Sequence, residues 1–288
     1  MNGILLIDKP AGWTSMDVCA KLRGLCGERR VGHGGTLDPM ATGLLVVFLG
    51  RATRAVEFAE GHRKTYETKL RPGLVTDTQD VTGTVLSEAP AAFSDEELEE
   101  VLARFRGEIE QLPPMYSAVK VNGQRLYRLA RKGREVERKP RPVTIYELAY
   151  LGRADDGDVL LNVTCSKGTY IRTLCHDIGE ALGCGGAMSA LRRVRCGGFD
   201  IAGAHTLEDV RAAADAGRVT DLLLPVETLF AGTPSVTLTA AQTKVVRNGG
   251  RFSSPLEQGN YLLYAPDGAF LALGNVMDGE LRVLKSFF

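Results

Sequence analysis

The segment GHGGTLDPMATG, from Gly32 to Gly43, combines a carboxylate with a backbone that can approach a ligand closely. Three of its first four residues are glycines, which have no side chain to prevent such an approach. Pro39 disfavours the helical conformation at Asp38 and so restricts the direction of the carboxylate. An Asp-Pro pair also commonly starts a helix, with aspartate as the N-cap, and the segment by itself favours neither interpretation. It lacks the Gly-Lys-Ser/Thr ending of a Walker phosphate loop.

A second candidate is SKGTYIRTL, from Ser166 to Leu174. Gly168 lets the chain turn, and Tyr170 and Arg172 then lie two residues apart, on one face of a predicted strand. An arginine beside a carboxylate favours its ionised form, and the planar guanidinium binds carboxylate or phosphate. Taken alone, however, the segment favours a surface arginine and a half-buried core tyrosine.

Basic residues dominate the segment from Lys120 to Arg141, which has nine of them against two acids, a local charge of +7. Tyr127 lies within the segment and Tyr116 just before it. Basic residues among aromatic ones suit a surface that follows an RNA backbone and stacks on bases. Most charge runs are solvated helix faces, but the excess of one sign favours RNA binding here. The nine are Lys120, Arg125, Arg128, Arg131, Lys132, Arg134, Arg138, Lys139 and Arg141.

The composition is that of an ordinary globular protein that needs no disulfide or metal to build a core. The 288 residues are 44% hydrophobic, and 35 basic residues balance 35 acidic ones. Zero net charge argues against binding to nucleic acid by global charge. It is compatible with a local basic surface, because phosphate contacts are local.

The cysteines and the N-terminal residues indicate neither a metal site nor export. The six cysteines form no C-x-x-C pair, and the adjacent Cys175, His176 and Asp177 could not face one ligand from a helix. We expect reduced structural thiols. The apolar stretch before Asp8 is too short for a signal peptide, and the run Leu44–Leu49 is too short for a membrane span, so we expect a cytosolic protein.

Apolar runs and capping residues outline the elements that must position these side chains. Strands are expected at Ile4–Ile7, at Lys64–Leu70, where buried and exposed side chains should alternate, and at Val159–Thr164, followed by a strand-to-helix segment at Thr169–Leu174. Helices are expected from Ser15 to Leu25, with Ser15 as the N-cap candidate, and from Ser94 to Phe105, where Ser-x-x-Glu predicts a capping box. A similar Thr-x-x-Asp sequence starts a helix at Thr206.

Beyond Gly232–Pro234 the sequence changes to short strand-like runs, typical of a small and mostly β module. A domain boundary is therefore expected there. The runs are separated by the pairs Gly249-Gly250, Gly259-Asn260, Asp267-Gly268 and Asp278-Gly279.

Taken in order, these segments resemble the TruB family of tRNA pseudouridine synthases over roughly residues 2–230. The resemblance rests on LLIDKPAGWTS, GHGGTLDPMATGLL, KTYE, TDTQDVTG, PPMYSAVKVNGQRLYRLAR, CSKGTYIRTL and LRRVRCGGFD. Gly34, Met40 and Pro72 depart from the residues that are usual in the family, and none of these changes removes a reactive group. Residues 234–288 resemble, less specifically, the small PUA-like domain of the family.

The resemblance implies an α+β fold. A catalytic domain at 1–231 would be built on a mixed, antiparallel-rich sheet of the pseudouridine synthase type, with an RNA-gripping insertion at about 115–142. A small, β-rich, PUA-like domain would follow at 232–288. The implied reaction converts uridine 55 in the T-loop of tRNA to pseudouridine without cofactor or metal. The target base must be flipped out of the folded loop, which such enzymes read by shape, stacking and backbone contacts.

The resemblance also implies roles for single residues. Asp38 would act at the sugar as the catalytic nucleophile or an equivalent carboxylate, with Arg172 paired to it. Tyr66 would stack on the target uracil and could move a proton. Lys9 and Pro10 would brace the Asp38 loop, and His33 would fill the gap left by the flipped base. Tyr170 would line the pocket, and Leu191 would pack on the base. Further RNA contacts would come from Gly35, Thr36, Lys120, Arg125, Arg128 and Arg131.

Three alternatives remain open. A non-catalytic protein that binds or folds RNA would use the same basic segment but would not require Asp38, Tyr66 and Arg172. A guide-RNA-dependent pseudouridine synthase shares the Asp motif, although the short chain without a basic tail favours a stand-alone monomer with no obligatory protein partner. A metal hydrolase using His33, Asp38 and His176 is disfavoured by the ligand spacing.

Overall fold

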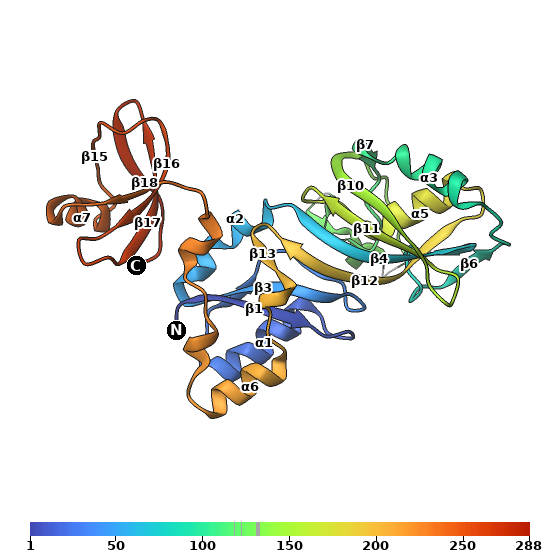
Figure 1. Ribbon diagram of the computed structural model, residues 1–288, viewed down its shortest axis with the longest axis horizontal. Helices are drawn as coiled ribbons and strands as arrows, with labels where there is room; N and C mark the ends of the chain where they lie inside the picture. Colours follow the sequence, from blue (N-terminus) through green and yellow to red (C-terminus); the bar gives the residue numbers. More distant parts are fainter. Residues whose placement is uncertain (118, 122, 131–132) are drawn as a thin grey trace.

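The computed structural model describes residues 1–117, 119–121, 123–130 and 133–288. Within them the chain forms a nine-stranded sheet flanked by helices and, at its C-terminal end, a five-stranded sheet that lies apart from the first (Figure 1). The fold class is therefore α+β with mainly antiparallel strands, as predicted.

The large sheet has the strand order β1-β3-β12-β4-β11-β10-β7, with β2 paired to β3 and β13 to β12. Among these described strands, only β3 and β12 pair in parallel. The strands are β1 (Gly3–Lys9), β2 (Val31–His33), β3 (Thr42–Leu49), β4 (Lys64–Pro72), β7 (Gly107–Gln111), β10 (Arg141–Arg153), β11 (Val159–Cys165), β12 (Gly186–Cys196) and β13 (Phe199–Asp200).

Helices cover the sheet at its two ends (Figure 1). Near β1 lie α1 (Ser15–Cys26) and α6 (Leu207–Asp215), and near β10 and β12 lie α3 (Asp95–Ala103) and α5 (Ile171–Ala181). None of the helices within the described residues has the length and apolar character needed to span a bilayer. The shorter elements are η1 (Gly50–Ala55), α2 (Val56–Glu60), the hairpin β5 (Leu74–Thr76) and β6 (Val85–Glu88), the hairpin β8 (Lys120–Val121) and β9 (Gln124–Arg125), α4 (Leu126–Ala130), η2 (Ile201–Gly203), η3 (Val219–Leu222) and η4 (Val226–Phe230).

The burial of each strand explains its sequence pattern. Strand β1 is buried on both faces: Leu5 and Ile7 pack towards α1 and α6, and Ile4 and Leu6 pack on the opposite side. Such a strand carries a continuous apolar run. Strand β4 has one buried face, with Tyr66, Thr68 and Leu70 inside and Glu67 outside, which confirms the predicted alternation.

Two of the three predicted helix starts are confirmed, and one is shifted. Ser94 and Thr206 are N-caps with capping boxes, as the Ser-x-x-Glu and Thr-x-x-Asp sequences indicate. The first helix is capped by Thr14 rather than Ser15, with Asp17 completing the capping box. The prediction was wrong by one residue because Ser15 is buried and its hydroxyl bonds to the backbone of Leu37 instead.

The segment around Arg172 is not a strand. Strand β11 ends at Cys165, Tyr170 is the N-cap of α5, and Arg172 lies in the first turn of that helix. The expectation that Tyr170 and Arg172 share a strand face was therefore wrong. Helix α5 has a strongly apolar buried face that includes Leu174 and Ile178, and packing of this face against the sheet outweighs the strand-like pattern.

The C-terminal sheet has the order β14-β16-β17-β18-β15, and its turns at Asp267-Gly268 and Asp278-Gly279 confirm two predicted breaks. Gly259 and Asn260 instead begin a strand, and a helix that was not predicted precedes β15. The elements are β14 (Ser235–Thr237), α7 (Ala240–Arg247), β15 (Arg251–Ser253), β16 (Gly259–Tyr264), β17 (Phe270–Met277) and β18 (Glu280–Ser286).

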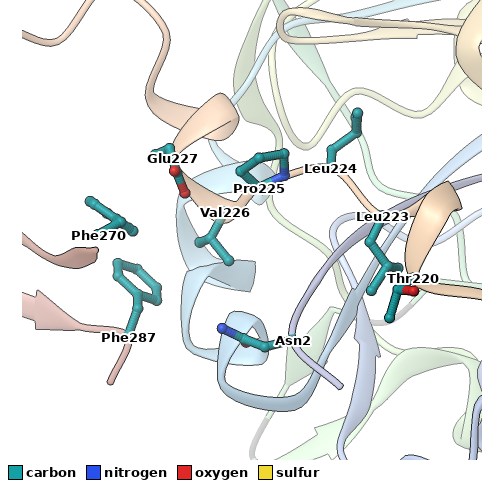
Figure 2. A pocket seen from close by; sticks show the side chains of 9 residues that line it. All are labelled: Asn2, Thr220, Leu223, Leu224, Pro225, Val226, Glu227, Phe270 and Phe287. Carbon is teal, nitrogen blue, oxygen red and sulfur yellow. The ribbon is translucent and has the colours of Figure 1, made fainter. Parts of the chain in front are cut away.

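Aromatic rings join this sheet to the rest of the molecule. The Phe230 ring lies 5.2 Å from that of Phe58 and 6.0 Å from that of Phe287, measured between centroids. A pocket of about 380 Å³ opens beside the joint, and Figure 2 shows Phe270 and Phe287 on one side of it and Val226 on the other. None of its lining residues is one of the predicted site residues, so it is separate from the Asp38 site.

Candidate active site

Asp38 lies in the loop between β2 and β3, at the start of a tight turn. The Asp38 carbonyl accepts a hydrogen bond from the Ala41 N–H at 3.1 Å, and strand β3 begins at the next residue, Thr42. The alternative interpretation of Asp38 as the N-cap of a helix is therefore wrong. Ser15, at the start of α1, holds the loop by two hydrogen bonds. Its hydroxyl accepts from the Leu37 N–H at 2.9 Å and donates to the Leu37 carbonyl at 3.1 Å.

Lys9 braces the same loop. The side chain is fully buried, and its ammonium donates to the carbonyls of Pro10, Trp13 and Pro39 at 2.8, 2.7 and 3.3 Å. Burial lowers the pKa of Lys9 to about 8, partly opposed by the nearby carboxylate of Asp38. Lys9 is the last residue of β1, and its hydrogen bond to Pro39 connects this strand to the residue after Asp38.

Arg172 pairs with Asp38 at 2.9 Å, between Nε and Oδ2. The arginine is 5% exposed, whereas the Asp38 side chain is 38% exposed, so the carboxylate is open to a ligand on one side and held on the other. The remaining guanidinium nitrogens donate to the carbonyls of Thr78 and Tyr116, both at 2.9 Å. The default interpretation of Arg172 as a surface arginine is wrong.

A second carboxylate, that of Asp80, also faces Arg172, with 3.8 Å between Asp80 Oδ2 and Arg172 Nε. Asp80 is 5% exposed, and its other oxygen accepts from the hydroxyls of Thr78 and Thr82 at 2.9 and 2.5 Å. Sequence reasoning did not select this residue. The threonines around Asp80 in TDTQDVTG were the one sequence feature that could have indicated it, because such side chains form hydrogen bonds within a turn.

Tyr66 and Leu191 belong to the same buried cluster as Leu37, the residue before Asp38. Each of Tyr66 and Leu191 is 8% exposed, one on β4 and the other on β12. Burial raises the pKa of the Tyr66 phenol to about 12, against a smaller opposite effect of Arg193, so the hydroxyl is protonated at neutral pH.

Tyr170 stands where α5 begins. Its backbone N–H donates to the side chain of Gln111 at 2.7 Å, and the Gln111 amide donates back to the Tyr170 carbonyl at 3.0 Å. Burial raises the pKa of the Tyr170 phenol, and the charge of Arg172 has a smaller, lowering effect. Tyr170 is therefore close to the Asp38–Arg172 pair, on a backbone fixed from β7.

The residues before Asp38 differ in exposure. His33 is half-buried at the end of β2. Burial lowers its pKa, and the charge of Arg193 lowers it further, so the neutral imidazole is favoured. Gly35 has a φ of 98°, a conformation that favours glycine, and its carbonyl accepts from Arg193 Nη2 at 3.1 Å. Thr36 is exposed and free to contact a ligand.

Within the described residues, the basic segment contains the hairpin β8–β9, the short helix α4 and an irregular stretch at 134–140. Lys120 lies in β8, Arg125 in β9, and Arg128 is exposed on α4, while Arg131 lies outside the described residues. The segment begins four residues after Tyr116, whose carbonyl accepts a hydrogen bond from Arg172.

In the described part of the chain, no three His, Cys, Asp or Glu residues are grouped so that they could hold a metal ion. All six cysteines are free thiols, which confirms the prediction of reduced cysteines.

Two protein-family models match consecutive parts of the chain. Residues 23–171 match the model described as TruB family pseudouridylate synthase (N terminal domain), and residues 172–231 match the tRNA pseudouridylate synthase B C-terminal domain. The chain is 46% identical over 283 residues to tRNA pseudouridine synthase B of Azoarcus sp. (strain BH72), covering 98% of this chain and 93% of that protein. It is 40% identical over 293 residues to that of Clostridium kluyveri, covering both chains completely.

Solved structures also match along nearly the whole chain. A crystal structure of a Cbf5-Nop10-Gar1 complex aligns with a TM-score of 0.77 and 27% identity over 99% of this chain and 85% of that one. A structure of an H/ACA RNP bound to a substrate RNA containing 2′-deoxyuridine aligns with a TM-score of 0.75 and 25% identity, with the same coverage. With the family models matched and full-length relatives at 40% identity or more, the chain belongs to the TruB family of tRNA pseudouridine synthases.

Proposed function

We propose that the protein isomerises uridine 55 in the T-loop of tRNA to pseudouridine, with Asp38 as the catalytic carboxylate. The reaction breaks the bond from C1′ to N1 of the uracil, turns the base, and forms a bond from C1′ to C5. The proton lost from C5 is balanced by one gained at N1, so no oxidant or cofactor is required. The observation that carries the proposal is the half-exposed Asp38 carboxylate held at 2.9 Å by a buried arginine.

The other site residues are assigned to parts of this reaction. Asp38 acts at the sugar, by attack on C1′ or through a glycal route. Tyr66 stacks on the flipped uracil and its protonated hydroxyl is available to move a proton, while Leu191 packs on the base. Tyr170 lines the pocket, and His33 fills the gap that the flipped base leaves.

RNA binding is assigned to the surface beyond the site. Lys120, Arg125, Arg128 and Arg131 contact phosphates of the T-arm from the insertion at about 115–142, together with Gly35 and Thr36 beside Asp38. We propose a catalytic domain at 1–231 and a PUA-like RNA-binding domain at 232–288; the separate five-stranded sheet from Ser235 onward supports this division.

The similarities favour direct recognition of tRNA over a guide RNA. The chain is 46% identical to a tRNA pseudouridine synthase B, against 27% to the chain from the Cbf5 complex. We therefore propose a monomer that acts on tRNA in the cytosol without an obligatory protein partner. Opening the T-loop to flip a base also disturbs tRNA tertiary contacts, and we propose that the protein assists tRNA folding in this way.

The test is to incubate the protein with unmodified tRNA transcript and map pseudouridine by chemical sequencing. Modification at position 55 is expected, and an isolated T-arm stem-loop should also be modified. Tight binding of RNA without pseudouridine would favour the non-catalytic alternative. A requirement for intact tRNA would show that recognition extends well beyond the T-arm.

A further inference from the structure

Arg193 is among the most deeply buried large side chains in the molecule, at 1% exposure on β12. Within the described residues it forms no ion pair with a carboxylate; its Nε donates to the Leu44 carbonyl at 2.7 Å and its Nη2 to the Gly35 carbonyl at 3.1 Å. A buried charge held only by neutral oxygens is costly. Because burying this charge is costly, we expect the guanidinium to have a role that a neutral side chain could not perform.

The two carbonyls lie on either side of Asp38. Gly35 precedes it by three residues and Leu44 follows it by six, so one planar side chain holds both ends of the Asp38 loop. The approach is close, since a Cβ at Gly35 would lie 3.4 Å from Arg193 Nη1. At Gly43 a Cβ would lie 2.3 Å from the Arg193 carbonyl, so β3 and β12 are packed backbone against backbone at this point.

Arg193 also reaches Tyr66 across the sheet. The two residues are directly opposite in the antiparallel pairing of β4 and β12, which places their side chains on one face at short range. The charge of Arg193 lowers the pKa of the Tyr66 phenol, against the larger opposite effect of burial. The loop that carries Asp38 and the strand that carries Tyr66 thus share one anchoring group.

We propose that Arg193 is a positioning residue, whose guanidinium fixes the Asp38 loop and the Tyr66 hydroxyl in one geometry relative to the target uridine. This inference rests on the proposed function for its effect on rate. Its structural part, the anchoring of the loop, does not depend on which RNA is modified. Lysine has the charge but not the planar fork, so it cannot donate to the Gly35 and Leu44 carbonyls in the same geometry beside Tyr66.

The test compares Arg193→Lys and Arg193→Met with Arg195→Lys. Arg195 is a suitable control, because it lies two residues further on the same strand, is exposed, and pairs with Asp200 at 2.8 Å. Single-turnover rates at saturating tRNA should fall about 10²-fold in Arg193→Lys, the scale of a misplaced reacting group, with the RNA Kd within about twofold of wild type. Arg195→Lys should keep the wild-type rate.

Two further measurements separate positioning from general destabilisation. In combination with Tyr66→Phe, the loss caused by Arg193→Lys should be smaller than in the parent, because both changes remove the same support. Hydrogen exchange of the peptide spanning residues 34–44 should be faster in either folded Arg193 variant and unchanged in Arg195→Lys. This last readout is informative even if wild-type protein forms no pseudouridine at position 55, the result that would refute the proposed function instead.

Three results would overturn the inference. One is a folded Arg193→Lys or Arg193→Met protein with the wild-type rate. Another is a loss confined to RNA affinity. The third is unchanged exchange of residues 34–44 in folded Arg193 variants, which would show that the guanidinium does not anchor the loop.

Discussion

The charged residues around Asp38 and those of the segment 120–141 differ in what surrounds them. Lys9 and Arg172 are buried and bound to backbone carbonyls, whereas Arg128, Arg134 and Lys139 are exposed. Buried groups with fixed partners define a geometry. Exposed groups create a field that salt screens within about 10 Å at 0.1 M ionic strength.

The comparison predicts that the two regions fail in different ways. Changes around Asp38 should lower the rate of turnover and leave the salt dependence of RNA binding unaltered. Changes in the segment 120–141 should lower affinity in a salt-dependent manner and leave the rate at saturating RNA nearly unaltered.

The largest effect is expected for Asp38→Asn. The amide is nearly isosteric with the carboxylate but cannot act as a nucleophile, so pseudouridine formation should fall to background while RNA affinity stays close to wild type. Pseudouridine mapping and filter binding measure the two quantities. Asp200→Asn, which breaks the surface pair with Arg195, serves as the control. Substantial pseudouridine formation by purified Asp38→Asn protein would show that Asp38 is not the catalytic carboxylate.

Tyr66→Phe should come next. It keeps the ring, whose stacking is worth on the order of 1–3 kcal/mol per base, and removes the hydroxyl, whose part in proton transfer is worth about 10²–10⁴-fold in rate. We expect normal binding and a single-turnover rate lower by that factor, and a Tyr66→Leu variant that loses binding as well. A Phe variant within about twofold of wild type would leave Tyr66 as a stacking platform only.

Alanine at Arg125, Arg128 and Arg131 tests the proposed role of the basic segment in RNA binding. Each charge removed should flatten the log–log dependence of affinity on salt by roughly one unit, because fewer counterions are released on binding. The dissociation constant is measured between 50 and 200 mM salt, with the exposed Arg211 and Arg218 replaced as controls. An unchanged slope in the triple variant would show that this segment does not grip RNA.

The smallest effect concerns Lys9 and the pH dependence of stability. Since its pKa is lowered from 10.5 to about 8 in the folded protein, the unfolded chain binds the proton more tightly, and stability should rise with pH between about 8 and 10.5. From pH 7 to 9.5, the free energy of unfolding of wild type should gain about 2 kcal/mol over that of Lys9→Met. Urea titrations at the two pH values measure it. Parallel changes in both proteins would mean that Lys9 is not desolvated as the structure indicates.

Local features of the fold could be predicted from the residues because their causes are local. Capping residues at Ser94 and Thr206 predicted helix starts, and the alternation in Lys64–Leu70 predicted a half-buried strand, since both depend on neighbours within a few positions. The motifs around Asp38 and Arg172 supported the resemblance to the TruB family, and the resemblance implied that these two residues pair.

The tertiary structure decided which charges are buried and what holds them. No local pattern showed that Arg172 is buried, that Asp80 shares it with Asp38, or that Arg193 binds the backbone on both sides of the Asp38 loop. These contacts join residues far apart in the chain, and they form only when β3, β4, β12 and α5 are packed together. The sequence by itself thus determined the reactive groups and several of the elements, while the directions of those groups follow from long-range packing.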